Sequence, residues 1–263
     1  MLFSVVIFWP GVRCQVSLIR WDNWQVYPAR CAILVLESTP MTEPLILLAS
    51  NSPRRRQLLR WMGIPLLFRA ADLDETPAVG ETALAYVSRL AGQKAQAVAN
   101  HALPGWLVLG ADTVVVDGEQ LLGKPADEAD AQRMLVQLRG RTHRVCSAVA
   151  LYDPQSGQLW QTAYCAEVPM RNYTEQEIVA YIRTGDAMDK AGGYAIQHPG
   201  FHPVEQFVDC YACVVGLPLC HVALLLHWAG RSPHISAPLA CRVMLGYRCP
   251  VFSQILQDRK SVV

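Results

Sequence analysis

The sequence predicts an α/β domain between Pro44 and about Gly230. Short apolar runs, which are typical of strands, alternate with segments in which apolar residues recur every three or four positions, which is typical of helices. Capping residues and glycines mark the ends of the helical segments, as at Ser52-Pro53 and Gly63. Strands and helices that alternate along a chain indicate a sheet covered by helices.

The first half of the domain contains two strands in apolar runs and two helices with apolar stripes. Ser52 is the expected N-cap of the first helix, and Pro53 suits its first position. A turn at Asp117-Gly118 joins the second long apolar run to a return strand. In order, we expect a strand at 45–48, a helix at 53–62, a helix at about 81–100, a strand at 106–116 and a return strand that ends in GKP, 123–125.

The second half continues the alternation. Thr174 and Glu177 form a capping box, which predicts the start of a helix. The stretch DPQSGQ, 153–158, reads as a turn between two strands. In order, we expect a helix at 127–139, strands at about 143–151 and 158–168, a helix at 174–183, a strand near 207–215 and a helix after Pro218.

The two ends of the chain lack either pattern. Residues 1–40 begin with the apolar stretch MLFSVVIFWPG but have no basic segment before it, so they make a poor signal peptide. We interpret 1–40 as an N-terminal extension outside the native fold, 41–230 as the domain and 231–263 as a C-terminal tail. The alternative is that the tryptophans of residues 1–40 cover an exposed sheet edge.

Composition argues against several classes of partner. Lys and Arg number 23 and Asp and Glu 22, a formal charge of +1, whereas a nucleic-acid-binding protein normally has a basic surplus. No segment approaches the ~20 apolar residues of a membrane span. We therefore expect neither a nucleic-acid nor a membrane partner.

Nine cysteines without regular spacing, in a chain too long to need disulfides, favour a reducing, cytoplasmic setting. Cys210 and Cys213 form a CxxC, and Cys220 and His221 follow. No second pair completes a zinc-binding set, so we expect buried thiols there rather than a structural metal.

Three arginines occupy the first turn of the helix that begins at Pro53. Cations are unfavourable at a helix N-terminus by about 0.3 to 1 kcal/mol each. A bound polyanion would neutralise both the arginines and the positive end of the helix dipole. Phosphate suits this place, because it can accept from the free N–H groups, from the hydroxyls of Ser50 and Ser52 and from the guanidinium groups of Arg54 and Arg55. The alternative is a solvated arginine face.

Two charged side chains fall where the pattern calls for apolar ones. Asp112 lies within LVLGADTVVV, and an isolated buried carboxylate is costly. It is therefore expected to be paired, bound to metal or at the floor of a cleft, unless it caps a neighbouring loop. Lys94 follows Leu90 and Val87 at helical spacing, which turns it toward the apolar stripe, where it either snorkels to solvent or reaches the cleft.

The segment GEQLLGKP, 118–125, has the spacing of a phosphate-binding P-loop, but Pro125 replaces the required hydroxyl. The segment also forms the second arm of a hairpin, whereas a P-loop opens a helix. The Asp117-Gly118 turn would pair 112 with 123 and bring Lys124 beside Asp112, although strict alternation points Lys124 to the other face.

An acidic cluster occupies a loop that follows the first helix. Asp72, Asp74 and Glu75 would be solvated surface groups if they acted alone. Together with Asp112 they offer hard oxygen ligands for Mg²⁺ or Mn²⁺.

Five stretches of the sequence occur in the order and spacing of one family. The stretches LILLASNSPRRRQLL, DLDET, LGADTVVV, GKP and DKAGGYAIQ resemble the Maf family of nucleoside triphosphate pyrophosphatases, historically linked to septum formation. The resemblance runs from about Pro44 to Gly230. It implies an elongated mixed sheet with flanking helices, of the inosine-triphosphatase type, with two lobes around a cleft, and it implies a homodimer.

The resemblance also implies a reaction and roles for individual residues. NTP and water would give NMP and pyrophosphate, with Asp112 as the proton acceptor. By motif position, Arg54, Arg55, Lys94 and Lys124 match triphosphate-binding residues, and Glu75 and Asp112 are the candidate ligands of a divalent metal. Ser50 and Lys190 are further candidates for the phosphate clamp.

Thr113 and Gln197 resemble the residues of the dTTP/UTP subfamily. A glutamine amide offers one donor and one acceptor, which suits uracil or thymine, but a flipped amide would suit cytosine. The stretch from His198 to Pro218 departs from the family pattern, which leaves one wall of the cleft open to question. A methylated-purine pyrophosphatase and a non-catalytic, nucleotide-binding regulator of division are the alternatives.

Overall fold

A computed structural model describes residues 45–257 of the 263-residue chain. Its centre is a mixed sheet with the strand order β2-β1-β3-β5-β6, and β4 pairs with β3 outside this path. The strands are β1 (Ile46–Leu48), β2 (Leu66–Phe68), β3 (Leu107–Asp117), β4 (Gln120–Leu122), β5 (Thr142–Tyr152) and β6 (Leu159–Pro169). The predicted α/β class is confirmed. The expected extension at 1–40 lies outside the described residues.

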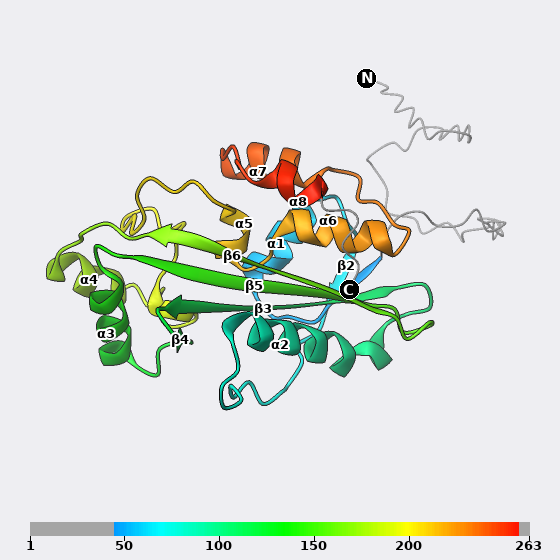
Figure 1. The fold of residues 1–263 in the computed structure, drawn as a ribbon, viewed down its shortest axis with the longest axis horizontal. Helices are drawn as coiled ribbons and strands as arrows, with labels where there is room; N and C mark the ends of the chain where they lie inside the picture. Colours follow the sequence, from blue (N-terminus) through cyan, green and yellow to red (C-terminus); the bar gives the residue numbers. More distant parts are fainter. Residues whose placement is uncertain (1–44, 258–263) are drawn as a thin grey trace, which may run out of the picture. The chain divides into compact units, whose positions relative to one another are not determined.

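Helices cover both faces of the sheet (Figure 1). The helices longer than a single turn are α1 (Pro53–Trp61), α2 (Ala83–Ala97), α3 (Glu128–Leu138), α4 (Glu175–Ile182), α5 (Tyr211–Val215), α6 (Leu219–Trp228), α7 (Ala237–Leu245) and α8 (Phe252–Gln257). One face packs against α2, and the opposite face packs against α1, α5, α6, α7 and α8. None of the helices within 45–257 is both long and apolar enough to cross a bilayer.

Alternation along β1 and β3 divides the core between the two faces. Leu47 and Val108 pack toward α2, whereas Ile46, Leu48 and Leu109 pack toward α1 and α6. A third cluster, formed by α3, α4 and the far ends of β3, β5 and β6, fills the other end of the long strands. Residues 112 and 113 consequently face opposite sides of one strand, in the stretch between the clusters.

The predicted helix starts are confirmed at three caps. The Ser52 hydroxyl accepts from the Arg55 N–H at 3.4 Å and caps α1. Asp127 caps α3. Thr174 and Glu177 form the expected capping box of α4.

Two expectations about the chain after Asp209 are wrong. The apolar run near 207–215 contains a short helix, α5, rather than a strand, and Gly216 ends it with a φ of 110°. The segment after Arg231 looked unpatterned but contains α7 and α8, whose Ala237, Ala240 and Ile255 join the core. Both helices are short, so their apolar residues do not span enough turns to give a periodic signal.

The hairpin register also differs from the expected one. Val115 pairs with Leu122 and Asp117 with Gln120, so the two-residue turn consists of Gly118 and Glu119. Gly118 has a φ of 61°, a conformation that glycine adopts without a Cβ penalty. Extension of this register would pair 112 with 125 rather than with 123.

The cysteines divide into two groups. Cys210, Cys213 and Cys220 are buried free thiols, as expected. Cys146 and Cys165 form a disulfide, which the expectation of reduced cysteines did not include. These two residues lie directly opposite one another on β5 and β6, where Cβ atoms of antiparallel strands approach closely.

Candidate functional site

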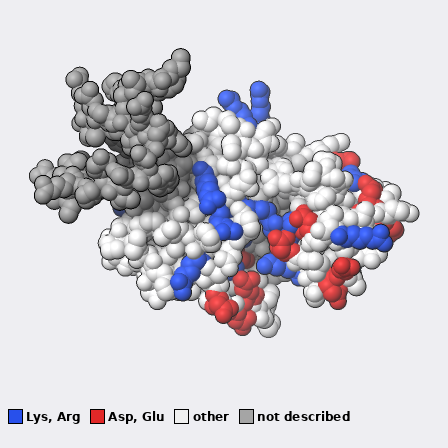
Figure 2. All heavy atoms as spheres, turned by 180° about the vertical axis from the view of Figure 1, so that it is seen from behind, with Lys and Arg blue, Asp and Glu red and all other residues white. Residues whose placement is uncertain are grey.

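One cavity of about 580 Å³ brings together all ten predicted site residues. They come from the turn between β1 and α1, α1 itself, the acidic loop, α2, β3, the segment after β4, and the glycine-rich connection after α4. The ten are Ser50, Arg54, Arg55, Glu75, Lys94, Asp112, Thr113, Lys124, Lys190 and Gln197. On one face of the molecule, basic and acidic side chains gather side by side (Figure 2).

The α2 wall of the cavity, which we define as Glu75, Lys94 and Asp112, is a compact charge cluster. Lys94 Nζ lies 2.6 Å from Asp112 Oδ1 and 2.6 Å from Glu75 Oε1. The side chains of Lys94 and Asp112 keep only 10% and 8% of their surface exposed. Lys94 therefore does not snorkel to solvent. It neutralises the carboxylate that the apolar strand carries into the core.

A close helix–strand contact sets this geometry. A Cβ on Gly110 would lie 2.0 Å from the carbonyl oxygen of Ala91, so only glycine lets α2 approach β3 at this point. Lys94 lies about one helical turn after Ala91, and Asp112 lies two residues after Gly110 on β3. A larger side chain at 110 would push the two charges apart.

Burial raises the pKa of Asp112, and this effect exceeds the opposing influence of Lys94 and Arg55. Nearby Glu75 raises it further. Within the described residues, Oδ1 of this carboxylate accepts a hydrogen bond from Lys94, and the carboxylate has no other hydrogen bond or ion pair. Oδ2 has no such partner within residues 45–257.

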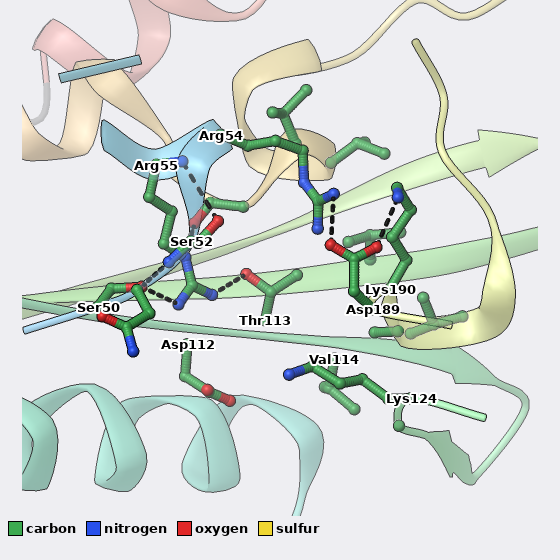
Figure 3. A pocket seen from close by; sticks show the side chains of 18 of the residues that line it. Ser50, Ser52, Arg54, Arg55, Asp112, Thr113, Val114, Lys124, Asp189 and Lys190 are labelled. Atoms are coloured by element: carbon green, nitrogen blue, oxygen red, sulfur yellow. Dashed lines mark hydrogen bonds and ion pairs between the residues drawn. The ribbon is translucent and has the colours of Figure 1, made fainter. Parts of the chain in front are cut away.

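The α1 wall of the cavity, which we define as Ser50, Ser52, Arg54 and Arg55, contains two arginines in different situations. Arg55 donates to the carbonyl oxygens of Gly216 (2.8 Å) and Ala111 (2.9 Å), and burial lowers the pKa of its guanidinium. It ties α1 to β3 and to the turn after α5. Arg54 instead makes one exposed ion pair, with Asp189 at 3.3 Å (Figure 3).

The two lysines opposite α1 also differ. Lys124 is exposed, and within residues 45–257 its ammonium makes no ion pair or hydrogen bond, so its donors are available to a ligand. Figure 3 shows it directed toward Asp112, although the hairpin register differs from the expected one. Lys190 is buried and uses its three donors on Asp186 O, Asp186 Oδ1 and Asp189 Oδ1, at 2.5 to 2.7 Å.

Thr113 and Gln197 line the cavity as expected, with different freedom. Arg55 Nη2 donates to Thr113 Oγ1 at 3.1 Å, and Thr113 shares a 2.8 Å hydrogen bond with Ser147, whose hydroxyl donates to Cys213 O. In this series of hydrogen bonds the Thr113 hydroxyl donates to Ser147 and accepts from Arg55, so one acceptor lone pair of Thr113 Oγ1 remains for a ligand. Gln197 is exposed.

Similarity to known proteins agrees with this arrangement. A family model described as "Maf-like protein" matches residues 45–229. The chain belongs to the Maf family. A Myxococcus xanthus protein named dTTP/UTP pyrophosphatase is 46% identical over 189 residues, which cover 72% of this chain and 94% of that protein. A protein of the same name from Ruegeria sp. (strain TM1040) is 43% identical over 185 residues, covering 70% and 94%.

Among solved structures, a nucleoside-triphosphatase / dITP/XTP pyrophosphatase from Mycobacterium abscessus shows 17% identity and a TM-score of 0.34. The match covers 70% of this chain and 94% of that one. Similarity this low supports no comparison of residues.

The α2 wall of this Maf protein was also predicted to hold a divalent cation. Within residues 45–257 no group of three or more His, Cys, Asp or Glu side chains could hold a metal ion. Glu75 and Asp112 nevertheless present two carboxylates to one point, the Lys94 ammonium. Mg²⁺ commonly binds through one or two carboxylates together with substrate phosphates, so Glu75 and Asp112 suit such an ion in ligand type, at a point that the Lys94 ammonium occupies in this structure.

Sequence reasoning missed four residues of the site. Tyr86 donates to the backbone oxygen of Glu75 at 2.8 Å and so holds the acidic loop, and Ser147 continues the Thr113 hydrogen-bond chain. Asp189 contacts Arg54 and Lys190, and Gly216 receives Arg55. Only Ser147, a polar residue inside an apolar strand, carries a signal comparable to that of Asp112.

Proposed function

We propose that this chain is a nucleoside triphosphate pyrophosphatase that converts dTTP and UTP to the monophosphate and pyrophosphate. The observation that carries the proposal is the position of Asp112. Its buried carboxylate lies in the cavity that Arg54 and Lys124 also line. The names of the relatives supply the choice of nucleotides. We extend the proposal to modified pyrimidine nucleotides, which would use the same contacts.

The reaction needs a base for water and cations for the leaving group. In our proposal Oδ2 of Asp112 accepts a proton from water as the water oxygen bonds to the α-phosphorus. The bond from that phosphorus to the bridging oxygen breaks, and pyrophosphate leaves. The raised pKa of Asp112 makes it a stronger base than an ordinary aspartate, which suits proton abstraction near neutral pH.

The phosphates would lie between the α1 wall and Lys124. The helix N-terminus, the Ser50 hydroxyl and the Arg54 and Lys124 side chains all attract negative charge. Arg55 would act mainly by holding these parts together, because its donors already reach backbone carbonyls. Lys190 would act through Asp189, because its own donors are in use.

A divalent cation, Mg²⁺ or Mn²⁺, is part of the proposal. Glu75 and Asp112 would hold it, and it would supply positive charge next to the phosphates. The nucleobase of the substrate would contact the Gln197 amide and the free acceptor lone pair of Thr113 Oγ1. The N3–H and O4 of uracil or thymine match the acceptor and the donor of the Gln197 amide, and a flipped amide would suit cytosine, so the choice of dTTP and UTP rests on the relatives' names.

The test is a panel of nucleoside triphosphates incubated with the protein and Mg²⁺ or Mn²⁺, with separate assays for NMP and pyrophosphate. We expect equal amounts of the two products, with dTTP and UTP turned over fastest. Tight nucleotide binding without pyrophosphate release would instead indicate the non-catalytic regulator of division. Preference for a methylated purine nucleotide would identify the other alternative.

Two further proposals concern the setting of the enzyme. We expect a homodimer, which light scattering coupled to size-exclusion chromatography would detect as twice the 29.2 kDa chain mass. We also expect a cytoplasmic location, which cell fractionation would test. Because the structure contains a Cys146–Cys165 disulfide, the redox state of these two cysteines in the purified protein should be measured as well.

A further inference from the structure

Asp189 lies between two cations on the side of the cavity away from Asp112. Its Oδ2 accepts from Arg54 at 3.3 Å, and its Oδ1 lies 2.6 Å from Lys190 Nζ (Figure 3). The first contact joins residues 135 positions apart in the sequence. Arg54 belongs to α1, which packs in one core cluster, whereas the segment around Lys190 packs in another. Asp189 therefore bridges two walls of the cavity.

The two halves of this bridge are unequally secured. The Lys190 side chain keeps 8% of its surface exposed and is held by Asp186 as well as by Asp189. The Arg54 and Asp189 side chains keep 30% and 60% of their surface exposed, and within residues 45–257 the Arg54 guanidinium has only this one hydrogen-bonded contact. Exposed ion pairs contribute little, so a polyanion can displace the Asp189 carboxylate from Arg54 while Lys190 retains it.

The bridge also lies at a boundary between two cavities. Arg54, Lys190 and Gln197 line both the main cavity and a neighbouring one of about 410 Å³. A phosphate on Arg54 would lie next to the Asp189 carboxylate, which now accepts from Arg54 Nη1. The two negative groups cannot both stay in contact with this arginine without repulsion.

We propose that Asp189 is a displaceable counter-charge, which positions Arg54 in the free protein, yields to the phosphate chain of the substrate and competes with pyrophosphate afterwards. This inference rests on the proposed function for the identity of the anion, but its competition with phosphate does not depend on turnover. Asp189 is in this sense a positioning residue that limits how tightly the product is held.

The test variant is Asp189→Asn, which keeps the shape of the side chain and removes its charge. The readouts are the Kd for pyrophosphate and for a non-hydrolysable dTTP analogue, measured by calorimetry, together with KM, kcat and inhibition by pyrophosphate. We expect both Kd values and the KM to fall about two- to fivefold, which is the range of an exposed ion pair. Inhibition by pyrophosphate should strengthen by a similar factor.

Two companion variants isolate the cause. Asp189→Glu keeps the charge and should restore wild-type Kd values. Glu119→Gln also removes one carboxylate, but it lies in the β3–β4 turn, has no partner within residues 45–257 and should leave both Kd values unchanged. In an Arg54→Ala background, Asp189→Asn should have a smaller effect than in the wild type, because the two residues act together.

Several results would overturn the inference. A higher KM for Asp189→Asn that extra Mg²⁺ corrects would make Asp189 a metal ligand. A lower melting temperature with unchanged Kd values would make its role structural. An undiminished effect in the Arg54→Ala background would show that it does not act through Arg54. If no nucleotide is hydrolysed and Asp189→Asn still tightens pyrophosphate binding, the proposed function fails while this inference stands.

Discussion

On the α2 wall the side chains of Lys94 and Asp112 keep 10% and 8% of their surface exposed, whereas Arg54 and Asp189, across the cavity, keep 30% and 60%. The interaction of the first pair takes place in a medium of low dielectric constant, and solvent screens the second. A buried charge pair holds its atoms in one geometry, because separating them leaves an uncompensated charge. An exposed pair exchanges partners at little cost.

The difference matches the tasks that we assign to the two walls. Proton abstraction requires an oxygen at a fixed place with a raised pKa, which burial provides. Phosphate binding and product release require cations whose present partners can leave. The following variants test whether this division holds.

The largest effect is expected at the buried Lys94–Asp112 pair of the α2 wall. Asp112→Asn keeps the shape of the side chain but removes the base and one candidate metal ligand. Turnover should fall by at least the ~10²- to 10⁴-fold typical of a lost general base. Lys94 keeps Glu75 as a partner, so the variant should remain folded, as circular dichroism would show.

Asp117→Asn is the matched control, because Asp117 lies on the same strand but bonds to Gln137 and Arg141. It should retain its turnover. A near wild-type rate for Asp112→Asn would contradict the assignment of the base.

Next in size is the contrast between the neighbouring arginines. Arg54→Ala should weaken nucleotide binding by about 10- to 150-fold, since a charge-assisted hydrogen bond contributes about 1.5 to 3 kcal/mol, and leave the melting temperature unchanged. Arg55→Ala should lower the melting temperature, because it leaves the oxygens of Ala111 and Gly216 without their donor. Arg60→Ala, at the exposed end of α1, is the control for both.

Calorimetric binding and thermal unfolding separate the two arginine effects. If Arg54→Ala unfolds the protein and the remaining folded fraction binds nucleotide normally, Arg54 has a structural role rather than a binding role. If Arg55→Ala keeps full stability, its backbone contacts do not brace the cavity.

Sequence reasoning predicted both members of the buried pair, Lys94 and Asp112, but only Arg54 of the exposed Arg54–Asp189 pair. Asp112 and Lys94 were detectable because each interrupts an apolar pattern, and a pattern of that kind reports burial directly. Asp189 lies in a polar loop, where one more carboxylate does not interrupt an apolar pattern and therefore gives no signal. Its role depends on a contact across 135 positions, which no local pattern encodes.

The same reasoning explains the errors in the fold. Long elements such as α2 and β3 were predicted within a few residues, because their apolar residues span several turns or pleats. The five-residue helix α5 was mistaken for a strand, because five apolar residues fit both periods. The hairpin register failed by two residues because a glycine turn can begin at either of two neighbouring positions.

A moderate effect is expected on the pH dependence of the reaction. The base must be ionised, so kcat/KM should fall as the pH drops through the raised pKa of Asp112. This acidic limb should lie above about pH 4, the range of an ordinary aspartate. Lys94→Met removes the largest influence that lowers this pKa, so its acidic limb should move to higher pH even as its rate falls. A limb that stays in place would show that a group other than Asp112 controls it.

The smallest effect is expected where the acidic loop meets α2. Both oxygens of Glu81 accept from Arg89 at 2.7 Å, and Arg89 also donates to Thr76 O, next to Glu75. These hydrogen bonds from Arg89 lower the pKa of Glu81 to about 2. A carboxyl group whose pKa is lowered by folding stabilises the protein above its unfolded pKa, about 4.5, and this contribution disappears as the pH falls toward 2.

Glu81→Gln should therefore lower the melting temperature slightly at pH 7, and the difference from wild type should vanish as the pH approaches 2. Thermal unfolding between pH 2 and pH 8 measures this, with Glu119→Gln as a control that should show no pH-dependent difference. Because Arg89 also holds the loop, the KM for Mg²⁺ or Mn²⁺ should rise modestly in the same variant. A stability difference that persists at pH 2 would mean that the glutamine disturbs packing rather than charge. The Glu81–Arg89 pair would then support the acidic loop by its packing rather than by its charge.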